Sequence, residues 1–107
     1  MKVKVLMPDE LWNQFSKEQP VYTQVREVEI PQEDIKHLLT HEADYFIDGV
    51  LDLAFKYGQN DFQTVDPGMR SVSVGDVIWI LDTDEYYKVE GLGFTEVKKS
   101  QLNLELK

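Results

Sequence analysis

The alternation of hydrophobic and polar residues predicts strands near both ends of the chain. Residues 2–7 alternate lysine with apolar side chains, which is typical of a strand with one solvated face. Residues 21–30 are strand-like, but their apolar residues change phase, which predicts a bulge near Arg26-Glu27 or two short strands. Residues 77–81 form an uninterrupted apolar run, which predicts a strand covered on both faces. We therefore expect Trp79, within this run, to be a buried core residue.

The chain after this apolar run has the pattern of a β-meander. Residues 82–85 are polar and predict a hairpin loop, with residues 86–89 as the partner strand. Gly91 and Gly93 lie close together and indicate a bulge or tight bend, because glycine tolerates positive φ. We expect Gly93 to adopt a backbone conformation that a Cβ would strain. These glycines could also let another backbone approach closely. Residues 94–97 predict a third strand.

Helical periodicity is found in the first half of the chain. Apolar residues recur every three or four positions over residues 43–57 and predict a helix, although Gly49 allows a break. Shorter helices are predicted over residues 8–19 and 32–39. The whole chain of 107 residues predicts a single domain. Its expected class is α+β, with a mostly antiparallel sheet of about five strands and two or three helices packed on one face.

A turn is predicted just before the apolar run. Ser71 and Ser73 alternate with valines, so their hydroxyl groups share one face of the chain. Gly75 and Asp76 follow, and an aspartate in this position commonly accepts a hydrogen bond from a nearby backbone N–H. We interpret Asp76 as a turn-forming residue rather than a catalytic one.

The C-terminal half resembles the YodL-like family, whose small proteins are found in bacterial genomes, phages and conjugative elements. The residues that carry the resemblance are Arg70-Ser71-Val72-Ser73-Val74-Gly75-Asp76-Val77-Ile78, Tyr86-Tyr87-Lys88-Val89 and Gly93-Phe94-Thr95-Glu96-Val97. Residues 51–57 are similar to the helix that leads into this motif. The chain departs from the family at Gly75, where many relatives have serine, and at residues 90–92, where an Asp-Ser-Phe-like run is common. Because the activity of the family is uncharacterised, the resemblance implies a mobile-element context and no mechanism.

The structural motif predicted from this half of the chain combines the turn, the apolar run and the meander. Its residues are Arg70, Ser71, Ser73, Gly75, Asp76, Trp79, Tyr86, Tyr87, Gly93 and Phe94.

The charge of the chain restricts the kind of partner. The formal net charge is −9, and a protein this acidic repels phosphate backbones, so we expect no direct nucleic-acid binding. The lack of cysteine excludes a thiolate metal site and a cysteine nucleophile, and it fits a reducing cytosol. The N-terminal residues lack the apolar core of a signal peptide, and no apolar run is long enough for a membrane span. We therefore expect a cytoplasmic protein with no membrane association.

The two histidines of the chain have a spacing that metal ligands can have. His37 and His41 are four residues apart and would share one face of a helix, as metal ligands must. A third ligand would have to come from Glu42 or Asp44. The residues between the histidines do not form a metalloprotease motif. The sequence favours two partly exposed histidines, and we expect no metal and no other cofactor.

The candidate partner-binding site is an acidic segment, residues 27–52. Asp44, Asp48 and Asp52 are four residues apart. On a continuous helix they would be separated by about 6 Å along the axis, close to the spacing of successive phosphates. Glu42 adds to this row, and Lys36 is the single lysine or arginine of the segment. The acidic side chains of the segment are Glu27, Glu29, Glu33, Asp34, Glu42, Asp44, Asp48 and Asp52.

Two hypotheses for the function follow. The first is a small acidic protein-interaction module, a phage or mobile-element factor that binds a basic host protein by imitating nucleic acid. The second is a small-ligand-binding or catalytic domain with a pocket between the helices and the bend at Gly91–Gly93. The sequence has no phosphate-binding loop, nucleophile elbow or marked carboxylate pair, so an enzyme is unsupported. A concentrated negative patch would favour the first hypothesis, and a deep pocket would favour the second.

Overall fold

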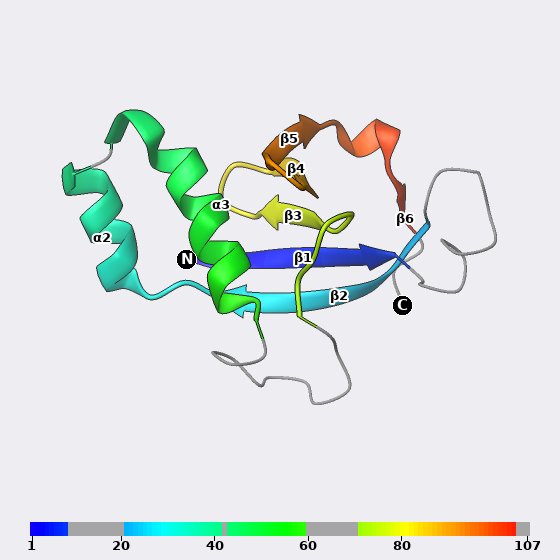
Figure 1. The fold of residues 1–107 in the computed structure, drawn as a ribbon, viewed down its shortest axis with the longest axis horizontal. Coiled ribbons are helices and arrows are strands. Elements are labelled where there is room, and N and C mark those ends of the chain that lie inside the picture. Colours follow the sequence, from blue (N-terminus) through cyan, green and yellow to red (C-terminus); the bar gives the residue numbers. More distant parts are fainter. Residues whose placement is uncertain (9–20, 42, 60–70, 105–107) are drawn as a thin grey trace.

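The computed structural model describes residues 1–8, 21–41, 43–59 and 71–104 (Figure 1). The helix predicted over residues 8–19 lies outside the described residues, apart from Pro8, which ends β1. Glu42 and Arg70 also lie outside the described residues. In chain order the elements are β1 (Lys2–Pro8), β2 (Val21–Glu29), α2 (Gln32–His41), the 3-10 helix η1 (Ala43–Tyr45), α3 (Phe46–Tyr57), β3 (Val77–Ile80), β4 (Glu85–Glu90), β5 (Gly93–Val97), the 3-10 helix η2 (Lys99–Gln101) and β6 (Asn103–Leu104).

The strands form one sheet in the order β5-β4-β3-β1-β2-β6. All neighbours are antiparallel except β6, which pairs parallel with the start of β2. The predicted bulge near Arg26-Glu27 is wrong in position, because β2 is one strand and its register with β1 shifts at Met7 and Pro8 instead. Strand β1 lies between β2 and β3, so that Val5 has Arg26 as its partner on one side and Ile78 on the other. The predicted α+β class, with its mostly antiparallel sheet, is confirmed.

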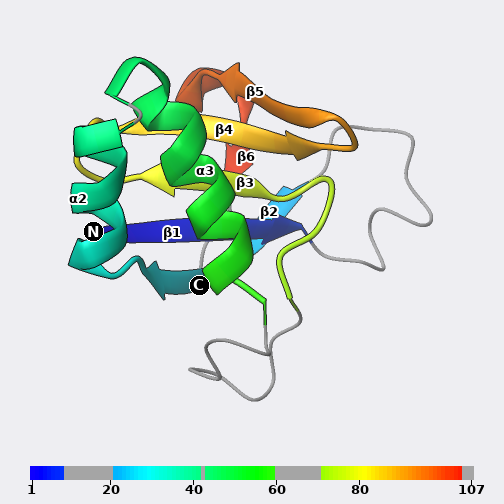
Figure 2. The ribbon, with the colours of Figure 1, turned by 60° about the vertical axis from the view of Figure 1, so that its left-hand side comes forward.

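Helix α3 lies across one face of the sheet, and α2 packs beside α3 near the start of β1 and the end of β2 (Figures 1 and 2). Successive residues of a strand point to opposite faces, so alternate residues of β1 and β3 face the helices. The fully buried side chains of this face form what we call the main core. They include Val3, Val5, Met7, Val28, Ile30, Val50, Leu51, Ala54, Ile78 and Ile80.

The opposite face of the sheet carries a smaller apolar group, the second cluster. Leu6, Tyr22, Val77 and Tyr86 are buried in it. The chain after β5 runs from the β5 edge of the sheet to the β2 edge (Figure 1), and its partly buried Leu102 packs against this cluster. The apolar strand β3 is therefore covered on one face by helices and on the other by the C-terminal segment.

The prediction that Trp79 is a buried core residue is wrong, because the residue is half-buried. Its ring stacks on Tyr86 with a centroid separation of 5.3 Å, and the Lys4 ammonium lies 5.5 Å from its centre. The indole Nε1 donates a hydrogen bond of 2.9 Å to the Asp84 carboxylate. Tryptophan suits such a border position because it combines a large apolar surface with one polar N–H.

Candidate functional site

The acidic row predicted from the sequence is only partly regular. Asp44, Asp48 and Asp52 are all exposed. Asp48 and Asp52 are one turn apart on α3, whereas Asp44 belongs to the 3-10 helix η1. Tyr45 ends η1 and is the N-cap residue of α3, and its backbone (φ −117°, ψ 29°) interrupts the helical path between them. The even spacing of about 6 Å expected from a continuous helix therefore holds only between Asp48 and Asp52.

The predicted helix is interrupted before Phe46 and not at Gly49, where the sequence allows a break. Gly49 lies inside α3, which continues to Tyr57. The side chain of Leu38 from α2 occupies the space that a Cβ on Gly49 would take. Here glycine permits close packing of two helices, and the buried contacts compensate for its low helix propensity.

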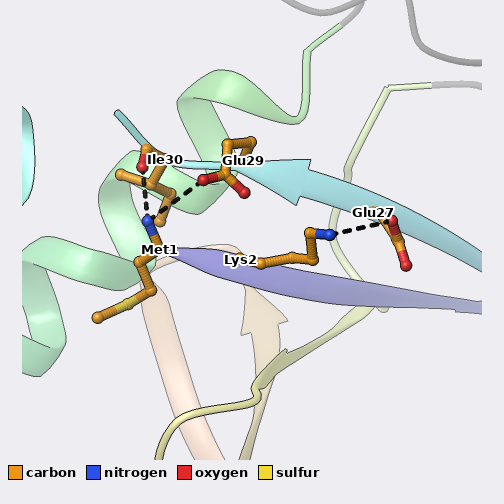
Figure 3. Close-up of polar contacts among 5 residues, drawn as sticks. All are labelled: Met1, Lys2, Glu27, Glu29 and Ile30. Atoms are coloured by element: carbon orange, nitrogen blue, oxygen red, sulfur yellow. Dashed lines mark hydrogen bonds and ion pairs between the residues drawn. The ribbon is translucent and has the colours of Figure 1, made fainter. Parts of the chain in front are cut away.

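The acidic residues of β2 lie on the face of the sheet that points away from the helices. Glu27 Oε2 is 3.9 Å from the Lys2 ammonium, and Glu29 Oε1 is 3.6 Å from the Met1 amino group (Figure 3). The same amino group donates a hydrogen bond of 2.8 Å to the Ile30 carbonyl. The acidic segment is thus divided between two faces, and its β2 part is paired with cations.

The acidic residues of α2 differ from each other in their role. Glu33 is exposed in the first turn of α2, where negative charge favours the helix dipole. Asp34 accepts a hydrogen bond of 2.5 Å from the Tyr57 hydroxyl, which joins α2 to α3. This hydrogen bond, with burial and the charge of Asp34 as further causes, raises the pKa of Tyr57. Asp34 therefore stabilises the helix pair rather than adding free charge to a binding surface.

Two hollows lie beside α3, and Asp52 lines both of them. The first lies between α3 and the β4–β5 hairpin and measures about 230 Å³; we call it the hairpin groove. Its lining residues are Asp52, Phe55, Val89, Glu90, Gly93 and Phe94. The second, about 250 Å³, lies between α2 and α3. Its lining residues are Asp34, His37, Leu38, Gly49, Asp52 and Leu53. Both are smaller than the roughly 300–1,000 Å³ of typical small-molecule sites.

The bend between β4 and β5 is a turn at Gly91 and Leu92, after which Gly93 begins β5. Gly93 has a φ of +145°, so the predicted backbone strain for a residue with a Cβ is confirmed. Apart from each glycine and its chain neighbours, no atom of the described residues lies within 4 Å of the position where Gly91 or Gly93 would carry a Cβ. Close approach of another described segment therefore does not explain these glycines.

The turn formed by residues 71–76 supports the sheet. Asp76 is fully buried, and its Oδ2 accepts a hydrogen bond of 2.9 Å from the Ser73 backbone N–H, which confirms the predicted turn. Gly75 has a φ of +97°, and its carbonyl accepts a bond of 3.4 Å from the Tyr22 hydroxyl. Burial and the charge of Asp76 raise the pKa of Tyr22. Ser71 is half-buried and Ser73 is exposed.

The aromatic residues of the motif divide between the two faces of the sheet. Tyr86 is buried in the second cluster, whereas Tyr87 and Phe94 are half-buried against the main core. The Tyr87 hydroxyl donates a hydrogen bond of 2.7 Å to Glu85 Oε2. Burial and this hydrogen bond raise the pKa of Tyr87, and the same bond lowers the pKa of Glu85. These three aromatic residues therefore contribute to the packing of the two apolar clusters.

His37 and His41 share one face of α2, with their ring centroids 4.6 Å apart. The described residues contain no group of three histidine, cysteine, aspartate or glutamate side chains that could hold a metal ion. None of the described helices has the length and apolar character needed to cross a membrane.

Comparison of the chain with protein-family models, with curated proteins and with solved structures finds no match. The hairpin groove lies beside Gly93, where the second hypothesis placed a pocket between the helices and the Gly91–Gly93 bend. The sequence patterns did not identify Phe55 and Glu90 as part of its lining. A local signal for Phe55 is its place on α3, three positions after Asp52.

Proposed function

We propose that the protein is a small interaction module that binds a basic surface of a partner protein through Asp44, Asp48 and Asp52. The observation that supports this proposal is the exposure of all three carboxylates on one helical segment. The sequence has no lysine or arginine between Lys36 and Lys56, so negative charge predominates over this segment, with Lys56 four residues after Asp52 on α3.

Electrostatics favours a cationic partner for this segment. Like charges four residues apart on a helix destabilise it by about 0.2–0.5 kcal/mol, and a bound cation would relieve that repulsion between Asp48 and Asp52. The net charge of −9 also attracts a basic protein over several ångströms and raises its association rate at low salt.

The resemblance to the YodL-like family suggests the context of this binding. We propose that the protein is a phage or mobile-element factor whose partner uses the same basic surface to bind nucleic acid. The interruption at Tyr45 means that the row is not a regular ladder of phosphate-like charges. The imitation of nucleic acid would depend on the carboxylates of Asp48 and Asp52 and on the local density of negative charge.

The hypothesis of a small-ligand or catalytic domain has one supporting observation, the hairpin groove beside Gly93. Its volume of about 230 Å³ suits a single side chain better than a metabolite. We therefore favour the interaction module over an enzyme.

The test is a pull-down from host lysate at low salt with the wild-type protein and with the variant Asp44→Asn, Asp48→Asn, Asp52→Asn. We expect the wild type to retain a basic protein that is released by added DNA and by raised salt. Exposed charges are screened over about 8–10 Å near physiological ionic strength, so binding should weaken steeply. The triple variant should lose the partner.

A matched control removes the same number of exposed carboxylates from the other parts of the chain. The control variant is Glu27→Gln, Glu29→Gln, Asp82→Asn, which leaves η1 and α3 unchanged. It should retain the partner. Equal loss of the partner in both variants would mean that net charge alone drives binding, and retention in both would contradict the proposal.

A further inference from the structure

The hairpin groove combines an apolar wall with an acidic rim. Val89 at its base is 3% exposed, and the rings of Phe55 and Phe94 are half-buried. The rim carries the exposed carboxylates of Asp52 from α3 and Glu90 from β4. No lysine or arginine is among its described lining residues. An occupant that complements this groove needs an apolar or planar body and a positive end.

The tip of the hairpin extends the apolar surface beyond the groove. Leu92 is fully exposed and lies between Glu90 and Gly93, two residues that line the groove. A single exposed leucine is common on protein surfaces. Here its position beside an open hollow adds an apolar contact for a polypeptide that crosses the hairpin, which a small free cation would not use.

We propose that the hairpin groove is the anchor site for one arginine side chain of the basic partner protein. This inference rests on the proposed function, in which the partner presents a basic surface. The methylene groups of the arginine would pack against Val89 and the two phenylalanine rings, as long cationic side chains commonly do on apolar surfaces. Its guanidinium would donate hydrogen bonds to Asp52 and Glu90.

Arginine fits this groove better than lysine for two reasons. Its guanidinium is planar and weakly hydrated, so it can stack on the Phe55 or Phe94 ring at a lower desolvation cost than a compact ammonium group. Its forked N–H groups can reach carboxylates on two sides, whereas an ammonium acts as a point charge. The volume of about 230 Å³ accommodates one such side chain.

The test is a two-dimensional ¹H–¹⁵N NMR titration of the whole chain with N-acetyl-arginine amide as the probe. We expect saturable shifts confined to signals of the hairpin groove and of Leu92. The lysine analogue should bind more weakly, and the neutral citrulline analogue should produce no saturable shift. Shifts spread over distant exposed carboxylates such as Asp82, or equal shifts with citrulline, would overturn the inference.

Two variants test the groove itself. Glu90→Gln, at an exposed position, should weaken arginine binding about threefold to fivefold, the upper range for an exposed ion pair. Phe94→Leu keeps an apolar side chain but removes the ring face, and it should reduce the preference for arginine over lysine. The ¹H–¹⁵N spectrum of each variant reports whether the fold is retained. Unchanged probe affinity in Glu90→Gln would overturn the inference.

A third variant separates this inference from the proposed function. The change Asp44→Asn, Asp48→Asn leaves Asp52 and Glu90 in place, so the titration with the arginine probe should be nearly unchanged. Capture of the basic partner from lysate should nevertheless weaken. Retained capture in the triple aspartate variant counts against the proposed function, whereas unchanged probe binding in Glu90→Gln counts against the groove alone.

Discussion

Gly49 of α3 lies directly against Leu38 of α2. A Cβ added to Gly49 would be 2.5 Å from Leu38 Cδ2, which is closer than two such carbons approach, and 3.0 Å from Cδ1, which is a tight contact. Leu38 is buried, so its movement would disturb the contact between the two helices. The lack of a side chain at Gly49 therefore allows α3, which carries Asp48 and Asp52, to pack closely against α2.

The first prediction concerns Gly49→Ala. Alanine favours the helix by about 1 kcal/mol, whereas overpacking of a buried site costs about 1–3 kcal/mol. We expect the free energy of unfolding to fall by about 1 kcal/mol, measured by urea denaturation. In a Leu38→Ala background the clash is absent, so the same change should stabilise the protein. Equal effects in both backgrounds would show that the two residues are not coupled.

The second prediction concerns Trp79. A fully buried tryptophan changed to alanine costs about 3–5 kcal/mol, and a half-buried one should cost about 2 kcal/mol. Trp79→Phe retains a ring that can stack on Tyr86 and loses only the hydrogen bond to Asp84, so its cost should stay below about 1 kcal/mol. Urea denaturation followed by circular dichroism measures both values. A loss of 4 kcal/mol or more in Trp79→Ala (about the fully buried value) would contradict the border position.

The third prediction concerns Gly93. Its φ of +145° strains any residue with a Cβ, whereas the space around it is open among the described residues. Gly93→Ala should therefore lower the free energy of unfolding by about 1–3 kcal/mol through the backbone alone. Gly93→Leu should cost nearly the same, because no neighbour would be displaced. A much larger loss for leucine than for alanine in thermal unfolding would indicate a steric contact instead.

The fourth prediction concerns the pH dependence of stability. The pKa of Tyr87 is raised in the folded state. The protonated hydroxyl therefore contributes fully to the free energy of unfolding below pH 10.0, the ordinary pKa, and this contribution is lost as the pH rises through the raised pKa. The pKa of Glu85 is lowered in the folded state. Its carboxylate therefore contributes to the free energy of unfolding above pH 4.5, the ordinary pKa, and this contribution is lost as the pH falls through the lowered pKa. Tyr87→Phe removes the hydrogen bond that links both groups. Its stability deficit should be greatest between these limits and should shrink on either side.

The measurement is urea denaturation of the wild type and Tyr87→Phe across the pH range. Tyr45→Phe, at an exposed tyrosine, serves as the matched control and should show no comparable dependence. A deficit for Tyr87→Phe that is constant with pH would mean that the hydroxyl contributes no charge-dependent stabilisation.

Much of the fold could be predicted from local patterns. The alternation in residues 2–7 and the apolar run in residues 77–81 both correspond to observed strands, because burial on a sheet imposes a period of two. The turn at Asp76 was predictable because it depends on a hydrogen bond between residues close in sequence.

The features that the sequence did not predict depend on contacts between residues that are distant in the chain. Trp79 has apolar neighbours in sequence, but its exposure is set by how far the C-terminal segment covers the second face. Arg26 is 2% exposed on the side of β2 that faces the main core, which a hydrophobicity pattern cannot predict for a charged residue. The sequence placed a pocket near the Gly91–Gly93 bend but did not predict its lining, because Phe55 and Phe94 come together only when α3 packs beside the hairpin.

The parallel pairing of β6 with β2 has a consequence for the order of folding. It joins Tyr22 to Leu104, so the chain must close a long loop before this contact forms, and such contacts form late because loop closure costs entropy. The hairpins β1–β2, β3–β4 and β4–β5 link strands nearer in sequence and can form earlier. On the ribosome, the second cluster would stay open until residues 102–104 had emerged, and its tyrosine and leucine side chains would remain accessible to chaperones until then.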